Sequence, residues 1–79
     1  MHIDDIVQVG AALGKVLLFV QIDNGDVWVY CQTFEKTASP CTWRATAEEQ
    51  FLPIAGLLPL AYTVLEPNVL MTVEPPRMW

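Results

Sequence analysis

The chain reads KVLLFVQI over residues 15–22, DNGD over 23–26 and VWVYCQTF over 27–34, and this stretch decides the fold. Its two outer runs are rich in β-branched and aromatic residues. They flank Asn24 and Gly25, a pair that is the strongest short-range signal of a β-hairpin. Both residues tolerate the positive φ angles of a type I′ turn. Such a turn predicts the opposed pairs Ile22–Val27, Val20–Val29, Leu18–Cys31 and Phe19–Tyr30.

Directly opposed residues of an antiparallel pair share one face of the sheet, so the predicted hairpin has an aliphatic face and a mixed face. The aliphatic face, which we expect to be core, consists of Val16, Leu18, Val20, Ile22, Val27, Val29 and Cys31. The mixed face consists of Leu17, Phe19, Gln21, Trp28, Tyr30 and Gln32.

The mixed face is too apolar for a sheet face in contact with water, so we expect something to cover it. The favoured cover is the C-terminal half of the chain or a second copy of the protein, because large aromatic residues serve core and dimer contacts more often than ligand binding. The alternative is a ligand or partner that docks on Phe19, Trp28 and Tyr30.

Length and composition predict one small β domain, residues 1–79, with more apolar surface than it can bury alone. Hydrophobic residues make up 53% of the 79 residues and charged residues only 16%. A chain of this size buries about 60% of the surface that its unfolded form exposes, and small chains with surplus apolar residues commonly oligomerise. The net charge of −5 disfavours nucleic acid and anionic membranes as partners, and it suits a basic protein partner.

The N-terminus and the cysteines predict a cytoplasmic protein with free thiols. The first residues, MHIDD, are acidic rather than basic, and no apolar run approaches the roughly 20 residues of a membrane-spanning helix. Without a secretion signal, Cys31 and Cys41 are more often free than paired. A disulfide between them is the alternative.

Outside the hairpin, the sequence predicts short strands separated by turns and loops. Its apolar and β-branched residues predict strands over residues 4–10, 43–46, 60–65 and 69–73. Small residues, glycines and prolines predict turns, loops or bulges over residues 10–14, 35–42 and 66–68, and residues 51–59 predict a strand end followed by a turn. A helix over residues 7–17 is a weaker alternative, because Gly10 and Gly14 both disfavour it.

Thr46 and Glu49 predict the helical element. They have the spacing of a capping box, in which each side chain accepts a hydrogen bond from a backbone N–H at the start of a helix. Pro53 limits such a helix to one turn. At the other end of the chain, prolines close the last strand at residues 74–76, and Trp79 either folds back onto the domain or is disordered.

Together these elements predict a mostly β fold. We expect a small antiparallel barrel or a strongly bent sheet of about five to six short strands, with one short helical turn.

Three segments follow one another in a recognisable order: VWVYCQTFE over residues 27–35, FLPIAGLL over 51–58 and AYTVL over 61–65. This order resembles that of SH3-like small β-barrels, including bromo-adjacent-homology domains. In those domains a central strand with an aromatic and polar end precedes an apolar, proline-containing stretch and a further strand. The similarity spans residues 16–66 and implies a module that binds chromatin or other proteins, but no site residue carries over from it.

The chain lacks the residue combinations that catalysis, metal binding and cofactor binding need. His2 is the single histidine, and its place near the terminus makes it a poor general base. The chain has no second histidine that could activate Cys31 or Cys41 as a nucleophile. The acidic pairs at residues 4–5 and 48–49 are adjacent, and neighbours on a strand point to opposite faces. Neither zinc-site spacing nor a phosphate-binding glycine loop is present. We therefore expect a protein that is not an enzyme, with no metal site and no cofactor.

The favoured functional hypothesis is a non-enzymatic module that acts by protein–protein contact, as a homo-oligomer and with an unidentified protein partner. Its contact residues would be Phe19, Trp28, Tyr30 and Trp43, since Trp and Tyr dominate interaction hot spots. A second hypothesis is a small-molecule or peptide site lined by the same aromatic residues. A third is a phage or other mobile-element protein that inhibits a host protein, a role that suits a compact acidic chain.

Overall fold

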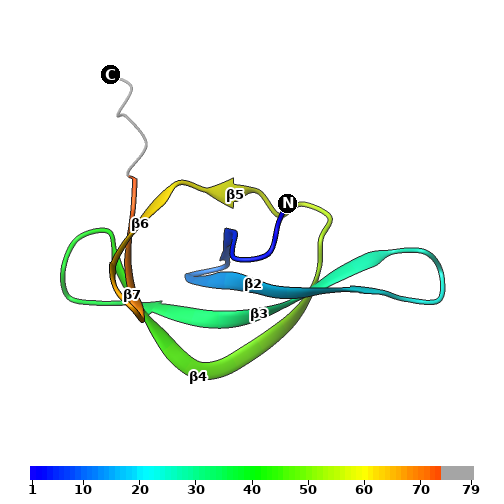
Figure 1. The fold of residues 1–79 in the computed structure, drawn as a ribbon, viewed down its shortest axis with the longest axis horizontal. Coiled ribbons are helices and arrows are strands. Elements are labelled where there is room, and N and C mark those ends of the chain that lie inside the picture. The colour runs from blue at the N-terminus through cyan, green and yellow to red at the C-terminus, as the bar shows by residue number, and fades with distance from the viewer. Residues whose placement is uncertain (74–79) are drawn as a thin grey trace.

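The computed structural model describes residues 1–73, which form one antiparallel sheet (Figure 1). The long strands are β2 (Ala12–Gln21), β3 (Val27–Lys36) and β4 (Thr42–Pro53), and the short strands are β1 (Ile6–Val9), β5 (Pro59–Leu60), β6 (Tyr62–Glu66) and β7 (Val69–Thr72). Their order across the sheet is β5-β1-β2-β3-β4-β7-β6. The predicted mostly β class is confirmed, and the sheet has 7 strands where about five to six were expected.

The sheet is strongly bent, because the strands at its two opposite edges are consecutive in the sequence. β5 and β6 are at opposite edges in the strand order, yet Ala61 alone separates them in sequence. They follow each other end to end and so cannot pair side by side. Within residues 1–73 no ladder joins the two edges, and hydrogen bonding therefore runs through one open sheet. The barrel alternative is wrong for this reason.

The β2–β3 hairpin forms where the Asn-Gly signal predicts it, but its turn is not type I′. Gly25 N–H donates to the Ile22 carbonyl at 2.9 Å, and Ile22 N–H donates to the Asp26 carbonyl at 2.9 Å. Gly25 has a φ of +88°, whereas Asn24 does not have a positive φ. This is the longer loop in which a type I turn is followed by a left-handed glycine. Asn24 stabilises it, because its Oδ1 accepts a hydrogen bond from Asp26 N–H at 3.0 Å.

The predicted register of the hairpin is wrong. Phe19 pairs with Val29 rather than with Tyr30, because the loop is one residue longer than a type I′ turn. A β-bulge between Val16 and Leu18 then shifts the register again. Since a slip of one residue moves every side chain to the other face, Leu18 shares a face with Tyr30, and Phe19 shares one with Val29.

The predicted helical turn at Thr46 is absent, and its residues lie in β4. The Thr46 hydroxyl accepts a hydrogen bond from Glu48 N–H at 3.1 Å. The β3–β4 register shifts between Gln32 and Phe34, opposite this segment. The capping chemistry of threonine therefore supports a bulge in a strand instead of the start of a helix. Pairing with β3 overrides the local preference for a helical turn.

Core clusters form on both faces of the sheet. One cluster consists of Ile6, Leu13, Phe34 and Leu70, with Trp43, Ala45, Leu60 and Tyr62 packed against it. The other consists of Val7, Val16, Val29 and Cys31, with Met1, Val9, Leu52, Ile54 and Leu57 packed against it. Because the neighbouring β1 residues Ile6 and Val7 enter different clusters, the sheet is buried on both sides at β1. The buried Val16, Val29 and Cys31 confirm part of the predicted aliphatic face.

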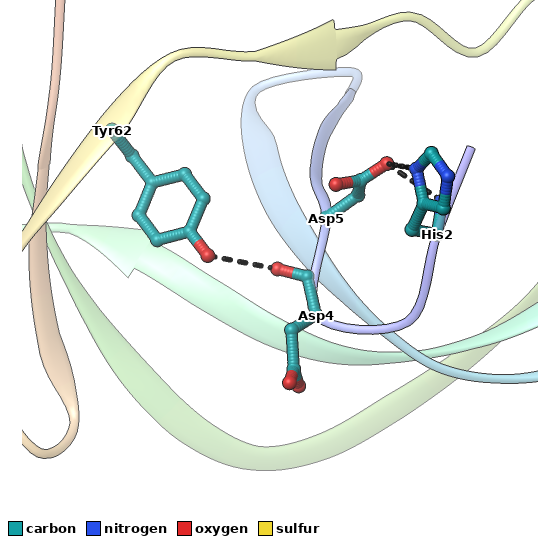
Figure 2. A network of polar contacts seen from close by, with 4 residues as sticks. All are labelled: His2, Asp4, Asp5 and Tyr62. Atoms are coloured by element: carbon teal, nitrogen blue, oxygen red, sulfur yellow. Dashed lines mark hydrogen bonds and ion pairs between the residues drawn. The ribbon is translucent and has the colours of Figure 1, made fainter.

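The N-terminal segment connects β2 to the edge strand β6 (Figure 2). The Tyr62 hydroxyl donates to the Asp4 carbonyl at 3.0 Å, and Asp4 N–H donates to the Val16 carbonyl at 2.8 Å. Within the segment, His2 N–H donates to the Asp5 carboxylate at 2.7 Å. Since Tyr62 also packs against a core cluster, these contacts hold the bent sheet together where strands do not pair.

The other predicted strands and turns are found with adjusted bounds. β1, β6 and β7 lie within or close to the predicted segments, and β4 ends at Pro53 before a turn in which Leu57 N–H donates to the Ile54 carbonyl at 3.1 Å. The alternative helix over residues 7–17 does not form. Trp79 lies outside the described residues. In the described part of the chain, no helix is long and apolar enough to cross a membrane.

Replacing Leu13 tests the core assignment. Leu13 is 2% exposed, so Leu13→Ala leaves a cavity, and we expect it to lower the free energy of unfolding by about 2–5 kcal/mol. Leu58 is 75% exposed, and the matched variant Leu58→Ala should change that free energy by less than about 0.5 kcal/mol. Urea denaturation of both variants measures the difference. Equal losses in the two variants would contradict the core assignment.

Candidate functional site

The three long strands extend beyond their neighbours. β1 pairs with β2 only over residues 12–15, and β7 pairs with β4 only over residues 42–44. The remaining parts of β2, β3 and β4 form a three-stranded arm, which we define as residues 16–21, 27–32 and 46–53. Figure 1 shows the hairpin end of this arm projecting from the rest of the sheet. One face of the arm is still covered, because Val16, Val29 and Cys31 pack in a core cluster with Val7 of β1. The other face extends beyond both β1 and β7.

One face of the arm carries contiguous apolar side chains. Directly opposed residues on neighbouring strands share a face, and the ladders give two such rows: Leu18–Tyr30–Phe51 and Val20–Trp28–Pro53. We call these residues the aromatic patch. It crosses β2, β3 and β4, so three strands of the same sheet hold its side chains in place.

The rings of the aromatic patch are in contact; Tyr30 and Phe51 are exposed, and Trp28 is half-buried. The centroids of the Trp28 and Phe51 rings are 5.0 Å apart, with 28° between the ring planes, and those of Tyr30 and Phe51 are 6.3 Å apart. These separations are typical of favourable aromatic pairs. Nevertheless Phe51 is 44% exposed, Tyr30 36% and Leu18 46%. Contiguous exposed apolar surfaces of this kind are typical of interaction sites.

The residues predicted from sequence to form the contact surface are divided by the structure. Trp28 and Tyr30 lie together in the aromatic patch. Phe19 lies on the opposite face of the arm and is 39% exposed. Trp43 packs against a core cluster, and its Nε1–H donates to the Thr72 hydroxyl at 3.1 Å. Trp43 is therefore a structural residue rather than part of the patch.

The sequence did not place Phe51, Pro53, Leu18 or Val20 on the contact surface. It assigned Leu18 and Val20 to the core face, because the predicted register differs by one residue from the observed one.

The predicted helical turn at residues 46–49 separated Phe51 from the hairpin, so it had no assigned neighbour on β3. If residues 42–53 are instead read as one strand, Phe51 falls two residues from Glu49 on the same face and opposite Tyr30. The presence of two aromatic residues and two threonines in residues 42–53 is the signal that favours a strand.

A hollow borders the aromatic patch where β4 bulges. Its volume is about 360 Å³, and its lining residues are Leu17, Gln32, Thr46, Ala47 and Glu49. The lining combines a carboxylate, an amide and a hydroxyl with apolar groups. Such a hollow suits a side chain or small ligand that has a positive charge and an apolar part.

Glu49 also acts on the aromatic patch itself. It raises the pKa of the Tyr30 phenol above its ordinary value, first by a side-chain hydrogen bond and second by its negative charge. The Tyr30 hydroxyl therefore keeps its proton to higher pH than an isolated tyrosine, and the patch itself remains neutral.

The groups that could support chemistry lie apart from the patch or are buried. Cys31 and Cys41 are both free, and burial raises the pKa of the Cys31 thiol. His2 lies 3.8 Å from the Asp5 carboxylate in the N-terminal segment (Figure 2). Over residues 1–73, no group of at least three His, Cys, Asp and Glu side chains is placed to hold a metal ion.

Comparison with known proteins found no matching family model, no matching curated protein and no matching solved structure. The resemblance to SH3-like barrels therefore stays a prediction, and the candidate site rests on the geometry of the chain itself.

Replacing Glu49 tests its contact with the aromatic patch. Glu49→Gln removes the negative charge that makes the phenolate unfavourable, so we expect the pKa of Tyr30 to fall towards its ordinary value. Glu48→Gln is the matched control and should leave the Tyr30 pKa raised. An NMR titration of isotope-labelled tyrosine separates Tyr30 from Tyr62. A Tyr30 pKa that is the same in the wild type and in Glu49→Gln would show that the two side chains do not interact.

Proposed function

We propose that this protein is a non-enzymatic interaction module that self-associates through the aromatic patch. The observation that carries the proposal is the exposure of Leu18, Tyr30 and Phe51 side by side on one face of a rigid sheet. Large aromatic side chains of this kind each contribute about 150–250 Å² of buried surface when a partner covers them. A rigid, preorganised surface also loses little conformational entropy on binding.

A second copy of the chain is the favoured occupant of the patch. Two sheets pack face to face about 10 Å apart, and an apolar face of one copy fits the same face of another. The molecule is only 19 Å across its shortest axis, so stacking adds the layer that the arm lacks. The chain carries a net charge of −5, but no member of the patch is charged, so copies meet there with the least repulsion.

The positions of the reactive side chains support the non-enzymatic part of the proposal. Cys31 is buried in a core cluster with a raised thiol pKa, which disfavours the reactive thiolate. His2 interacts with Asp5 in the N-terminal segment and is not a member of the patch. The patch itself offers aromatic and aliphatic groups, which suit contact rather than bond breaking.

Truncating the patch tests this function. We expect Tyr30→Ala combined with Phe51→Ala to lower the solution mass, because it removes the central exposed rings of the contact. The matched control is Val64→Ala combined with Leu65→Ala, which removes exposed apolar side chains from β6. Light scattering on a sizing column measures the mass, and circular dichroism confirms that each variant is folded. A mass that is unchanged by the patch variant would count against the proposed contact.

The hollow beside Tyr30 supports a second candidate function, the binding of a small cationic molecule or peptide side chain. Its Glu49 carboxylate would pair with the positive charge, and Leu17 would contact the apolar part. A series of alkylguanidines can be screened by thermal shift. A ligand at a hundred times its dissociation constant stabilises the fold by about 2.7 kcal/mol, and Glu49→Gln should abolish that gain. The absence of any shift across the series would exclude this candidate.

A further inference from the structure

The outer edge of β2 is free between the N-terminal segment and the hairpin turn. β1 pairs with β2 no further than Lys15. Val16 N–H donates to the Asp5 carbonyl at 2.9 Å, and the Val16 carbonyl accepts from Asp4 N–H at 2.8 Å. Beyond Val16, no strand in the described part of the chain pairs with this side of β2. The edge from Leu17 to the turn therefore faces solvent.

The alternation of the ladder shows which backbone groups point outward. Ile22 N–H donates to the Asp26 carbonyl across the hairpin, so the backbone of Val20, two residues earlier, also faces β3. In an antiparallel strand, the backbone groups of successive residues point alternately to the two sides. The N–H and C=O groups of Phe19 and Gln21 therefore point away from β3, towards the free edge.

The free edge of β2 lacks the features that normally prevent strands from pairing. Residues 16–22 read VLLFVQI, with no charged residue, proline or glycine. Natural proteins protect exposed edges with charged side chains, prolines, bulges or very short strands. The bulge at Leu17 lies at the inner end of this segment and leaves Phe19 and Gln21 in regular pairing. Uncharged segments of this composition associate strongly when their backbone is exposed.

The free edge of β4 has the opposite character. Ile54 N–H donates to the Val27 carbonyl of β3 at 3.0 Å. Phe51 and Glu49 are three and five residues earlier, so by the same alternation their backbone groups point away from β3. This edge carries the charges of Glu48 and Glu49, contains a bulge and ends at Pro53. Each of these features opposes the addition of a strand.

The terminal strands of the sheet are also poor edges for association. β5 has 2 residues, and β6 ends at Glu66 directly before Pro67. Among the edges that the structure describes, β2 therefore combines the longest uncharged segment with outward backbone groups. Because the chain has a net charge of −5, copies approach this uncharged edge with the least repulsion.

We infer that the free edge of β2 pairs with the same edge of a second copy in an antiparallel arrangement. The register that uses every outward group places Phe19 of one copy opposite Gln21 of the other, with a two-fold axis beside Val20. The N–H and C=O groups of Phe19 and Gln21 are then paired in both copies. A contact between identical edges is isologous and closes on itself.

This edge contact is separate from the proposed contact through the aromatic patch. The two-fold axis of an antiparallel edge contact is perpendicular to the sheet, so the aromatic patches of both copies lie on one continuous surface. Stacking of aromatic patches uses a different two-fold axis. Either contact alone produces a dimer, and the two contacts together produce a closed tetramer when their two-fold axes intersect at right angles.

Amide hydrogen exchange of the wild-type protein tests the edge contact directly. After correction for intrinsic rates, the Phe19 and Gln21 amides should exchange at least about tenfold more slowly than those of Glu49 and Phe51, which are the outward amides of the unpaired β4 edge. Diluting the protein until it dissociates should remove this difference. Equal exchange of the four amides in the associated protein would overturn the proposal.

Proline variants give a second test. Proline is tolerated in an edge strand where the N–H faces solvent, so Gln21→Pro removes an outward donor without removing a hydrogen bond within the chain. Val64→Pro is the matched control on the free edge of β6. Val73 N–H donates to the Ala61 carbonyl, so by alternation the backbone of Val64 points away from β7. We expect Gln21→Pro to halve the solution mass and Val64→Pro to leave it unchanged, with circular dichroism confirming the fold.

The outcomes separate the two contacts. If Tyr30→Ala with Phe51→Ala lowers the mass but Gln21→Pro does not, and the Phe19 and Gln21 amides are unprotected, the edge contact is overturned and the patch contact stands. If Gln21→Pro alone lowers the mass, the edge contact stands and the patch contact is overturned. A wild-type protein that is monomeric at every concentration would overturn both.

Discussion

The rest of the sheet depends on the pairing of β3 with both β2 and β4. The ladders run from Gln21–Val27 to Leu13–Phe34 on one side and from Trp28–Pro53 to Lys36–Trp43 on the other. This double pairing determines the conformation of segments whose local sequence favours something else. Residues 46–49 have the spacing of a helical capping box, yet they form a bulge in β4, since β3 provides backbone partners on both sides of the bulge.

The unequal lengths of the strands give the two ends of the sheet different roles. Where the short strands β1, β5 and β7 are present, side chains on both faces are buried in core clusters. Where the short strands stop, the same three long strands continue as the arm, and apolar residues that would otherwise be core become the aromatic patch. An exposed apolar surface thus arises from the absence of a covering layer over strands of ordinary core composition.

Charge is distributed unevenly around the arm. The β4 edge carries Glu48 and Glu49 and ends in Pro53, whereas the β2 edge is uncharged from Val16 to the turn. Carboxylates on the β4 edge oppose the addition of a strand there, whereas the β2 edge and the aromatic patch carry no charge. The net negative charge by itself indicates only solubility or a basic partner. The strand positions of Glu48 and Glu49 show in addition that the charge lies on one edge of the arm and not on the other.

The sequence by itself determined the mostly β class, the position of the hairpin and three of the seven residues on its expected core face. Alternating β-branched and aromatic residues and the Asn24-Gly25 pair act over a few neighbouring residues, so they can be read locally, and Val16, Val29 and Cys31 are buried as predicted. Only the tertiary structure decided the register. Two loop types share the Asn-Gly signal and differ by one residue, and the bulge at Leu17 has no local marker, yet each moves whole rows of side chains to the other face. The placement of Phe51 beside Trp28 and Tyr30, the removal of Phe19 and Trp43 from that surface, and the open rather than closed sheet all follow from pairings between segments distant in sequence, whose energies no local pattern contains.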